Sequence, residues 1–142
     1  MEVRLYWQDG LRFLGIAQDR AIIIDTKKDY GGFETGPAPM ELLLMALGSC
    51  TGMDVVSILK KMKVKIDGLE IDVSGKRRKD HPKYFTQITI VYRFFGADLP
   101  LDRIKHAIEL SQEKYCPIAA SLKGLAEIDY EIEVLTSKEK FI

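Results

Sequence analysis

The sequence has no excess of either charge, because 21 lysine and arginine residues balance 21 aspartate and glutamate residues over 142 positions. A neutral chain has no net field to attract nucleic acid or anionic lipid, so we expect neither as a partner. No uninterrupted apolar run reaches about 18 residues, so we expect no membrane span. The N-terminus lacks the apolar segment of a signal peptide, which predicts a cytoplasmic protein with thiols that are normally reduced.

The common motifs for binding metals and nucleotides are also missing. The sequence contains no Cys-x-x-Cys pair, which excludes a zinc knuckle and a thioredoxin-type motif. It has neither a Gly-x-Gly-x-x-Gly nor a Walker loop. The two histidines, His81 and His106, have no second ligand at a suitable spacing, and we interpret both as surface residues. We therefore expect no bound cofactor and no metal.

What the sequence does contain is a pair of cysteines in different settings. Cys50 lies about three turns into a long apolar helix, where the helix dipole has faded. Cys116 precedes Pro117 and is predicted to cap a short helix, where free N–H groups favour a thiolate. Local reasoning therefore makes Cys116 the more activated thiol. The alternative is that both cysteines are small core residues without reactivity.

The pattern of apolar residues predicts an α+β fold in a single domain over residues 1–142. Alternating residues indicate strands, and spacings of three and four residues indicate helices. The order is β-β-β-α-β-β-α-(α)-β with mainly antiparallel pairing. The expected strands occupy 3–7, 11–17, 22–24, 69–73, 86–94 and 128–134, and the expected helices begin at Pro39, near Pro100 and at Ile118.

The helix that begins at Pro39 is apolar on more than one face as far as Leu47. One small sheet can cover only one side of such a helix, so we expect a second sheet from a partner chain and an obligate dimer. Gly48 and Gly52 lie inside this helix at a cost of about 1 kcal/mol each relative to alanine. We expect them to allow close approach by another backbone or by a ligand.

Two motifs resemble the OsmC/Ohr family of thiol-dependent peroxidases. The stretch from Gly36 to Cys50 is similar to the family's Pro-Glu-x-Leu helix, and Cys116-Pro117-Ile118-Ala119 is similar to its Cys-Pro-Val-Ser helix start. The β-rich N-terminus and the Gly-rich loop after it extend the likeness over nearly the whole chain. The resemblance implies an OsmC-like fold, in which mainly antiparallel sheets surround a long central helix, and an intertwined homodimer.

The resemblance also implies a chemistry, and it reverses the local ranking of the two thiols. Cys50 would attack a hydroperoxide, organic in most members and hydrogen peroxide in some, and become a sulfenic acid. Cys116 would resolve it to a disulfide, and an external dithiol or lipoyl-type reductant would restore both. An arginine and a glutamate support the first cysteine in the family. Arg12 and Glu41 are the nearest matches here.

The glutamate departs from the family pattern, which places it directly after the proline that starts the helix. Met40 occupies that position here, and Glu41 is one residue later. One residue turns a helical side chain by about 100°. This departure motivates a second hypothesis, a non-enzymatic dimer that senses redox state or binds a small molecule. A hydrolase that uses Ser49 is a weaker hypothesis, because no histidine or aspartate arrangement supports it.

Overall fold

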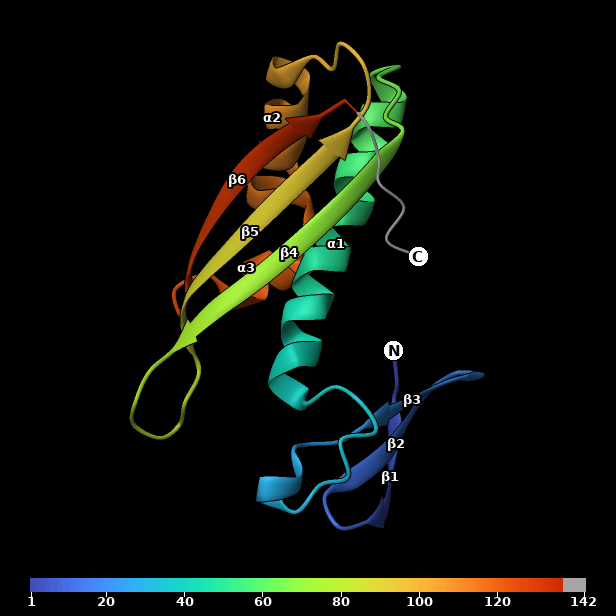
Figure 1. The fold of residues 1–142 in the computed structure, drawn as a ribbon, viewed down its shortest axis with the longest axis vertical. Coiled ribbons are helices and arrows are strands. Elements are labelled where there is room, and N and C mark those ends of the chain that lie inside the picture. Colours follow the sequence, from blue (N-terminus) through green and yellow to red (C-terminus); the bar gives the residue numbers. More distant parts are fainter. Residues whose placement is uncertain (137–142) are drawn as a thin grey trace. The chain divides into compact units, whose positions relative to one another are not determined.

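The structure, a computed structural model, describes residues 1–136. The chain divides into two compact units, Met1–Leu43 and Leu44–Ile142, and each is described by itself. Both units contain a three-stranded sheet (Figure 1). The α+β class predicted from the sequence is therefore confirmed, whereas the single domain over residues 1–142 stays a prediction.

The first unit is built on an antiparallel meander of β1 (Arg4–Asp9), β2 (Arg12–Ala17) and β3 (Arg20–Ile24). The turn between β1 and β2 contains Gly10, whose φ of 53° is in the region that glycine adopts without steric cost. Short turns of this kind give antiparallel neighbours, so the meander follows directly from the turn signals in the sequence.

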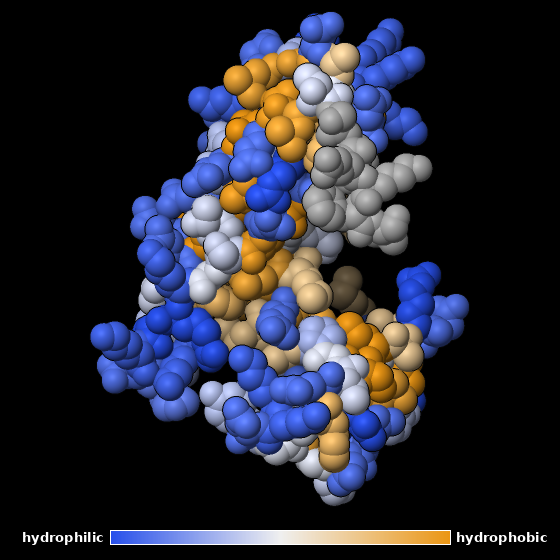
Figure 2. Space-filling model, viewed as in Figure 1, coloured by the Kyte–Doolittle hydropathy of each residue, from blue (hydrophilic) through white to orange (hydrophobic). Residues whose placement is uncertain are grey.

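One face of this sheet is apolar and exposed. Trp7 pairs with Phe13 and Leu5 pairs with Gly15, and residues directly opposite each other share a face. Gly15 in turn pairs with Ile22, so the same face continues onto β3. We call this set the exposed apolar face; its large members, all at least 37% exposed, are Leu5, Trp7, Phe13 and Ile22. Figure 2 shows the molecular surface coloured by hydropathy.

A loop organised by one buried carboxylate connects β3 to the first α-helix. Asp25 is 1% exposed and accepts hydrogen bonds from the backbone N–H groups of Thr26, Phe33 and Thr35 and from the Thr35 hydroxyl. Burial alone would raise the pKa of Asp25, but these hydrogen bonds lower it well below its ordinary value. The Asp25 N–H also donates to Pro37 O, which fixes the approach to the helix.

The second unit contains the larger sheet. Helix α1 (Pro39–Lys61) leads into it, and β4 (Gly68–Arg77) and β5 (Phe85–Phe95) form an antiparallel pair. The chain then forms α2 (Leu101–Leu110), a π turn η2 (Ser111–Tyr115), α3 (Pro117–Leu122) and β6 (Glu127–Leu135). Strand β6 pairs with β5 in parallel, because the helices between them carry the chain back to the start of the sheet.

The helices of the second unit lie on one face of the sheet β4–β5–β6 (Figure 1). The core between them consists of alternate residues of β5 and one side of α1 and α2. Gly48 and Gly52 let α1 approach β4, since a Cβ at these positions would meet Val73 Cγ2 at 2.8 Å and Ile71 Cδ1 at 2.7 Å. The close approach predicted at the two glycines therefore exists, but side chains of the sheet make it. The fully buried core residues include Leu47, Val55, Ile88, Ile90, Tyr92, Phe94, Ile104 and Ile108.

The opposite side of α1 is apolar and exposed. Met45, Met53 and Val56 are 56%, 72% and 44% exposed, and they follow one another along one helix face. By length and composition α1 could also cross a membrane, with a mean hydropathy of 1.9 over its most apolar window. An uninterrupted apolar run does not reveal this property, because polar residues such as Ser49 and Asp54 interrupt the apolar sequence of the helix. The core helix of a globular protein meets the same two criteria, and α1 packs on a sheet in that manner.

Candidate functional site

The two cysteines meet inside the second unit. Cys50 lies in α1 and is half-buried, whereas Cys116 follows the π turn η2 and is only 3% exposed. Their sulfur atoms lie within 4.8 Å of each other although 66 residues separate them in the chain. Packing of α1 against the segment from α2 to α3 brings them together. The pair therefore joins one accessible thiol to one sheltered thiol.

The backbone around Cys116 forms the helix cap that the sequence predicts. Its sulfur accepts a hydrogen bond from the N–H of Ala119 at 3.3 Å, and Pro117 occupies the first turn of α3. The N–H of Cys116 donates to Ser111 O at 2.8 Å, the i to i−5 contact that closes the π turn. This turn re-aims the chain between α2 and α3, so that Cys116 faces α1.

The cap does not activate Cys116. Burial, and after it hydrogen bonding with Cys50, raise the pKa of its thiol from 9.0 to about 11, although the N–H groups of α3 oppose the rise. The prediction that Cys116 is the more activated thiol is therefore wrong, because burial, a property of tertiary structure, outweighs the helix cap. Cys116 is therefore a protonated thiol at neutral pH, and of the two cysteines Cys50 is the more accessible.

A third ionisable group, which the sequence analysis missed, lies beside the two sulfurs. A carboxylate oxygen of Asp54 is within 4.8 Å of both cysteine sulfurs. Asp54 follows Cys50 by four residues on α1, a spacing that puts both side chains on one helix face. The four-residue spacing was the one sequence signal that could have placed Asp54 beside Cys50. Nothing in the local sequence shows that Cys116 faces the same point.

Asp54 is the end of a buried polar network that joins α1, β5 and η2. Ser111 Oγ lies 2.9 Å from Asp54 Oδ2 and 3.0 Å from Thr51 Oγ1, and Thr51 Oγ1 lies 2.7 Å from Tyr92 Oη. A carboxylate accepts hydrogen bonds, so the Ser111 hydroxyl donates to Asp54. Because a hydroxyl has only one proton, Ser111 must accept from Thr51, and Thr51 must in turn accept from Tyr92. The Gln112 amide donates to Tyr92 Oη at 3.1 Å. Burial raises the pKa of Tyr92, so it stays a donor at neutral pH.

Arg12 and Glu41, the other residues named by the sequence analysis, lie in the first unit. The Arg12 guanidinium lies 5.0 Å from the centre of the Phe33 ring, and its Nε is buried without a hydrogen-bond partner among the described residues. Glu41 Oε2 accepts a hydrogen bond from the N–H of Ala38 at 2.8 Å, as a carboxylate does at the start of a helix. The structure thus gives each side chain local partners, and the predicted assistance to Cys50 stays a prediction.

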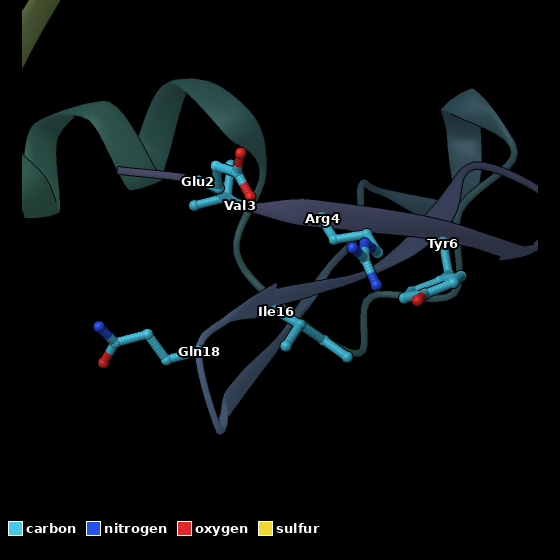
Figure 3. Close-up of a pocket in the computed structure, with 6 residues that line it drawn as sticks. All are labelled: Glu2, Val3, Arg4, Tyr6, Ile16 and Gln18. Atoms are coloured by element: carbon cyan, nitrogen blue, oxygen red, sulfur yellow. The ribbon is translucent and has the colours of Figure 1, made fainter.

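Each unit has at least one hollow on its surface. In the second unit Asp54 lines a cavity of about 350 Å³ together with Ser57, Ile58, Lys61, Met62, Leu110 and Tyr115. This cavity makes the carboxylate beside the cysteines accessible from solvent. In the first unit Arg4, Tyr6 and Ile16 line a hollow of about 440 Å³ with Glu2, Val3 and Gln18 (Figure 3). The second hollow contains none of the candidate site residues.

The class of protein defined so far is an α+β protein in which an accessible and a sheltered cysteine lie close together. Residues 32–131 match the model of the OsmC-like protein family. The chain is also 36% identical over 138 residues to protein YhfA of Escherichia coli K12, covering 96% of this chain and all of YhfA. The chain therefore belongs to the OsmC-like family, as the two motifs predicted.

Solved structures agree with this assignment. A hypothetical protein from Aquifex aeolicus is 34% identical and superposes with a TM-score of 0.79, covering 94% of this chain and 96% of that one. An organic hydroperoxide resistance protein OsmC from Legionella pneumophila superposes with a TM-score of 0.71 at 10% identity, over 94% of this chain and 96% of the other. The second likeness shows a shared fold.

Proposed function

We propose that this protein is a thiol-dependent peroxidase that reduces organic hydroperoxides. The approach of the Cys50 and Cys116 sulfurs to within 4.8 Å carries the proposal, because a sulfenic acid on one cysteine needs a second thiol within reach to form a disulfide. The different burial of the two thiols supports distinct roles. The more exposed Cys50 meets the peroxide, and the sheltered Cys116 resolves the intermediate.

The proposed reaction begins at the Cys50 thiolate, which attacks the O–O bond of ROOH. A sulfur–oxygen bond forms, the O–O bond breaks, and the alkoxide leaves and takes up a proton as ROH. Cys50 is now a sulfenic acid. The Cys116 sulfur displaces its hydroxyl group, which leaves as water with the Cys116 proton, and a disulfide remains. An external dithiol, such as a lipoyl group, reduces this disulfide and is itself oxidised to a cyclic disulfide.

Arg12 and Glu41 enter the proposal as supporting residues that come from the family resemblance. An arginine beside Cys50 would favour the thiolate and orient the peroxide, since a nearby cation lowers a thiol pKa. Arg12 has one buried Nε without a partner among the described residues, which leaves hydrogen-bonding capacity on its guanidinium. Glu41 would hold the arginine in the family arrangement.

We further propose that the active form is an intertwined homodimer. The exposed apolar face of the first unit and the exposed face of α1 in the second unit are both rich in large apolar residues. Exposed apolar surface of this kind is typical of protein–protein contacts, and a second copy of the chain is the simplest partner.

The first test is turnover of an organic hydroperoxide with a dithiol reductant. We expect Cys50→Ser to lower kcat/KM by about three orders of magnitude or more, because it removes the nucleophile. Cys116→Ser is the matched control. It should retain one fast reduction of peroxide per chain, since the sulfenic acid still forms on Cys50, and should lose efficient turnover with the dithiol.

The products of these variants separate the two roles. A sulfenic-acid reagent should label Cys50 in Cys116→Ser after peroxide treatment and should label nothing in Cys50→Ser. Full turnover by Cys50→Ser, or labelling at Cys116 in that variant, would remove Cys50 from the proposed role. Circular dichroism of both variants establishes that they are folded.

A second candidate function is a non-enzymatic dimer that senses redox state or binds a small molecule. The observation in its favour is the position of Glu41, whose carboxylate caps the start of α1 through Ala38 N–H. Thiol titration during peroxide treatment distinguishes the two functions. Fast loss of two thiols per chain supports the peroxidase, and slow loss that is equal for different peroxides supports the binding protein.

A further inference from the structure

The cluster formed by the two cysteines and Asp54 contains the donor atoms of a metal site. The two sulfurs and a carboxylate oxygen all lie within 4.8 Å of one another. Two of the three side chains, Cys50 and Asp54, come from consecutive turns of α1, and Cys116 comes from the start of α3. Rigid helices therefore supply all three groups.

The electrostatics of this cluster favour a cation. A thiolate and a carboxylate are both anions, so three such groups at these distances repel one another unless protons or a metal neutralise them. The cluster lies at the solvent-accessible end of the polar network, where the Ser111 hydroxyl donates to Asp54. A doubly charged metal ion would replace the thiol protons and satisfy all three groups at once.

The donor types and separations suit zinc. Zinc binds thiolates at about 2.3 Å and carboxylate oxygens at about 2.0–2.2 Å in tetrahedral geometry, which places neighbouring ligand atoms about 3.6–3.8 Å apart. The observed separations of at most 4.8 Å need to shorten by roughly 1 Å or less, which small side-chain rotations achieve. Two soft sulfur ligands also select zinc over magnesium or calcium, which prefer oxygen ligands.

The surroundings provide orientation and access. Ser111 Oγ donates to Asp54 Oδ2 at 2.9 Å and holds the carboxylate, in the manner of an outer-shell partner of a metal ligand. The Ala119 N–H donates to the Cys116 sulfur. Asp54 also lines a cavity of about 350 Å³, so an ion can reach the carboxylate from solvent.

We propose that the reduced protein binds one zinc ion through Cys50, Asp54 and Cys116, with water in the fourth position. Binding displaces the two thiol protons, and no electron is transferred. The disulfide form offers no thiolate and does not bind. Zinc and hydroperoxide therefore compete for Cys50. The zinc site does not depend on the proposed peroxidase function, because binding is measured without peroxide.

The test is a zinc titration of the full chain, reduced with a phosphine and compared with its disulfide form. We expect one zinc ion per reduced chain, release of the thiol protons on binding, and at least a tenfold loss of affinity on oxidation. Cobalt(II) in place of zinc should give a thiolate-to-cobalt absorption band whose intensity falls by about half in Cys116→Ser. Equal zinc binding by the reduced and oxidised forms, or no thiolate band, would overturn the proposal.

Substitutions of carboxylates test the role of Asp54. We expect Asp54→Asn to weaken zinc binding at least tenfold, and Ser111→Ala to weaken it about tenfold through the outer shell. Asp129→Asn is the matched control, since Asp129 is an exposed residue of β6. The zinc affinity of this variant should equal that of the unsubstituted protein. If Asp54→Asn binds zinc as tightly as this control, Asp54 is not a ligand. If the unsubstituted protein binds zinc but does not turn over peroxide, the result counts against the proposed peroxidase alone.

Discussion

At Cys116, two opposing influences act on one thiol. The N–H groups at the start of α3 stabilise a thiolate, and the Ala119 N–H contacts the sulfur at 3.3 Å. Burial and the neighbouring Cys50 disfavour the same thiolate. These two effects are the stronger, and the pKa of Cys116 is therefore raised to about 11. The result suits the resolving role proposed for Cys116, in which the thiol stays protonated until the proposed sulfenic acid forms on Cys50.

This balance predicts how the thiol titrates in Cys50→Ser, where Cys116 is the only cysteine. We expect its pKa to lie between 9.0 and about 11, because the variant removes the contribution of Cys50 but retains burial. The ultraviolet absorbance of the thiolate as a function of pH measures the midpoint. A midpoint below 9.0 would mean that the helix cap outweighs burial.

The same shift sets the direction of a stability change. In the unsubstituted protein the folded state retains the Cys116 proton up to about pH 11, whereas the unfolded thiol loses it near pH 9.0. The folded state then binds more protons, so this group's contribution to stability is complete below pH 9.0 and is lost as pH rises toward 11. Urea unfolding across this range measures the loss.

At the scale of elements, the packing of α1 on β4 is controlled by two glycines. Alanine in a helix is favoured over glycine by about 1 kcal/mol, but the added methyl group must fit beside the sheet. At Gly52 the obstacle is Ile71 Cδ1, the end of a flexible side chain. At Gly48 it is Val73 Cγ2, and a β-branched valine has little rotational freedom.

The two substitutions should therefore differ in effect. We expect Gly52→Ala to change the free energy of unfolding by less than about 1 kcal/mol, because the gain in helix propensity offsets the shift of Ile71. We expect Gly48→Ala to destabilise the protein by about 1–2 kcal/mol, because Val73 or the helix must move. Urea unfolding of the two variants measures the difference. Equal changes in the free energy of unfolding would show that the packing of α1 on β4 has room for a methyl group at both positions.

At the scale of the whole molecule, the distribution of apolar surface bears on assembly. Trp7 and Tyr6 are neighbours on β1 with opposite orientations, and both are exposed, at 66% and 47%. Only Trp7 belongs to the exposed apolar face, because it shares a face with Phe13 in the sheet register. The pair therefore provides a matched comparison for the proposed dimer.

We expect sedimentation equilibrium to give twice the chain mass of 16.1 kDa for the unsubstituted protein. Trp7→Glu should raise the dissociation constant at least tenfold, because a charge in an apolar interface loses its hydration. Tyr6→Glu should leave it unchanged. A single-chain mass at micromolar concentration for the unsubstituted protein would contradict the proposed dimer, and equal effects of the two variants would place the interface elsewhere.

Most of the fold could be predicted from the sequence, because its elements follow from local patterns. Pro39 marked the start of α1, and the alternation from Thr86 to Phe94 marked β5. The parallel pairing of β6 with β5 was not predicted, since it depends on where the crossover through α2 and α3 returns the chain. The π turn was also missed, because no residue of Ser111–Tyr115 departs from the helical spacing before it.

The sequence by itself determined the family, the strands and helices, the two cysteines and the helix cap at Cys116, because each depends on neighbouring residues. Only the tertiary structure decided what those cysteines face. The meeting of Cys50, Cys116 and Asp54 requires α1 to pack against the chain after α2. Burial, which raises the pKa of Cys116 against its own cap, likewise arises from residues that are distant in sequence and adjacent in space.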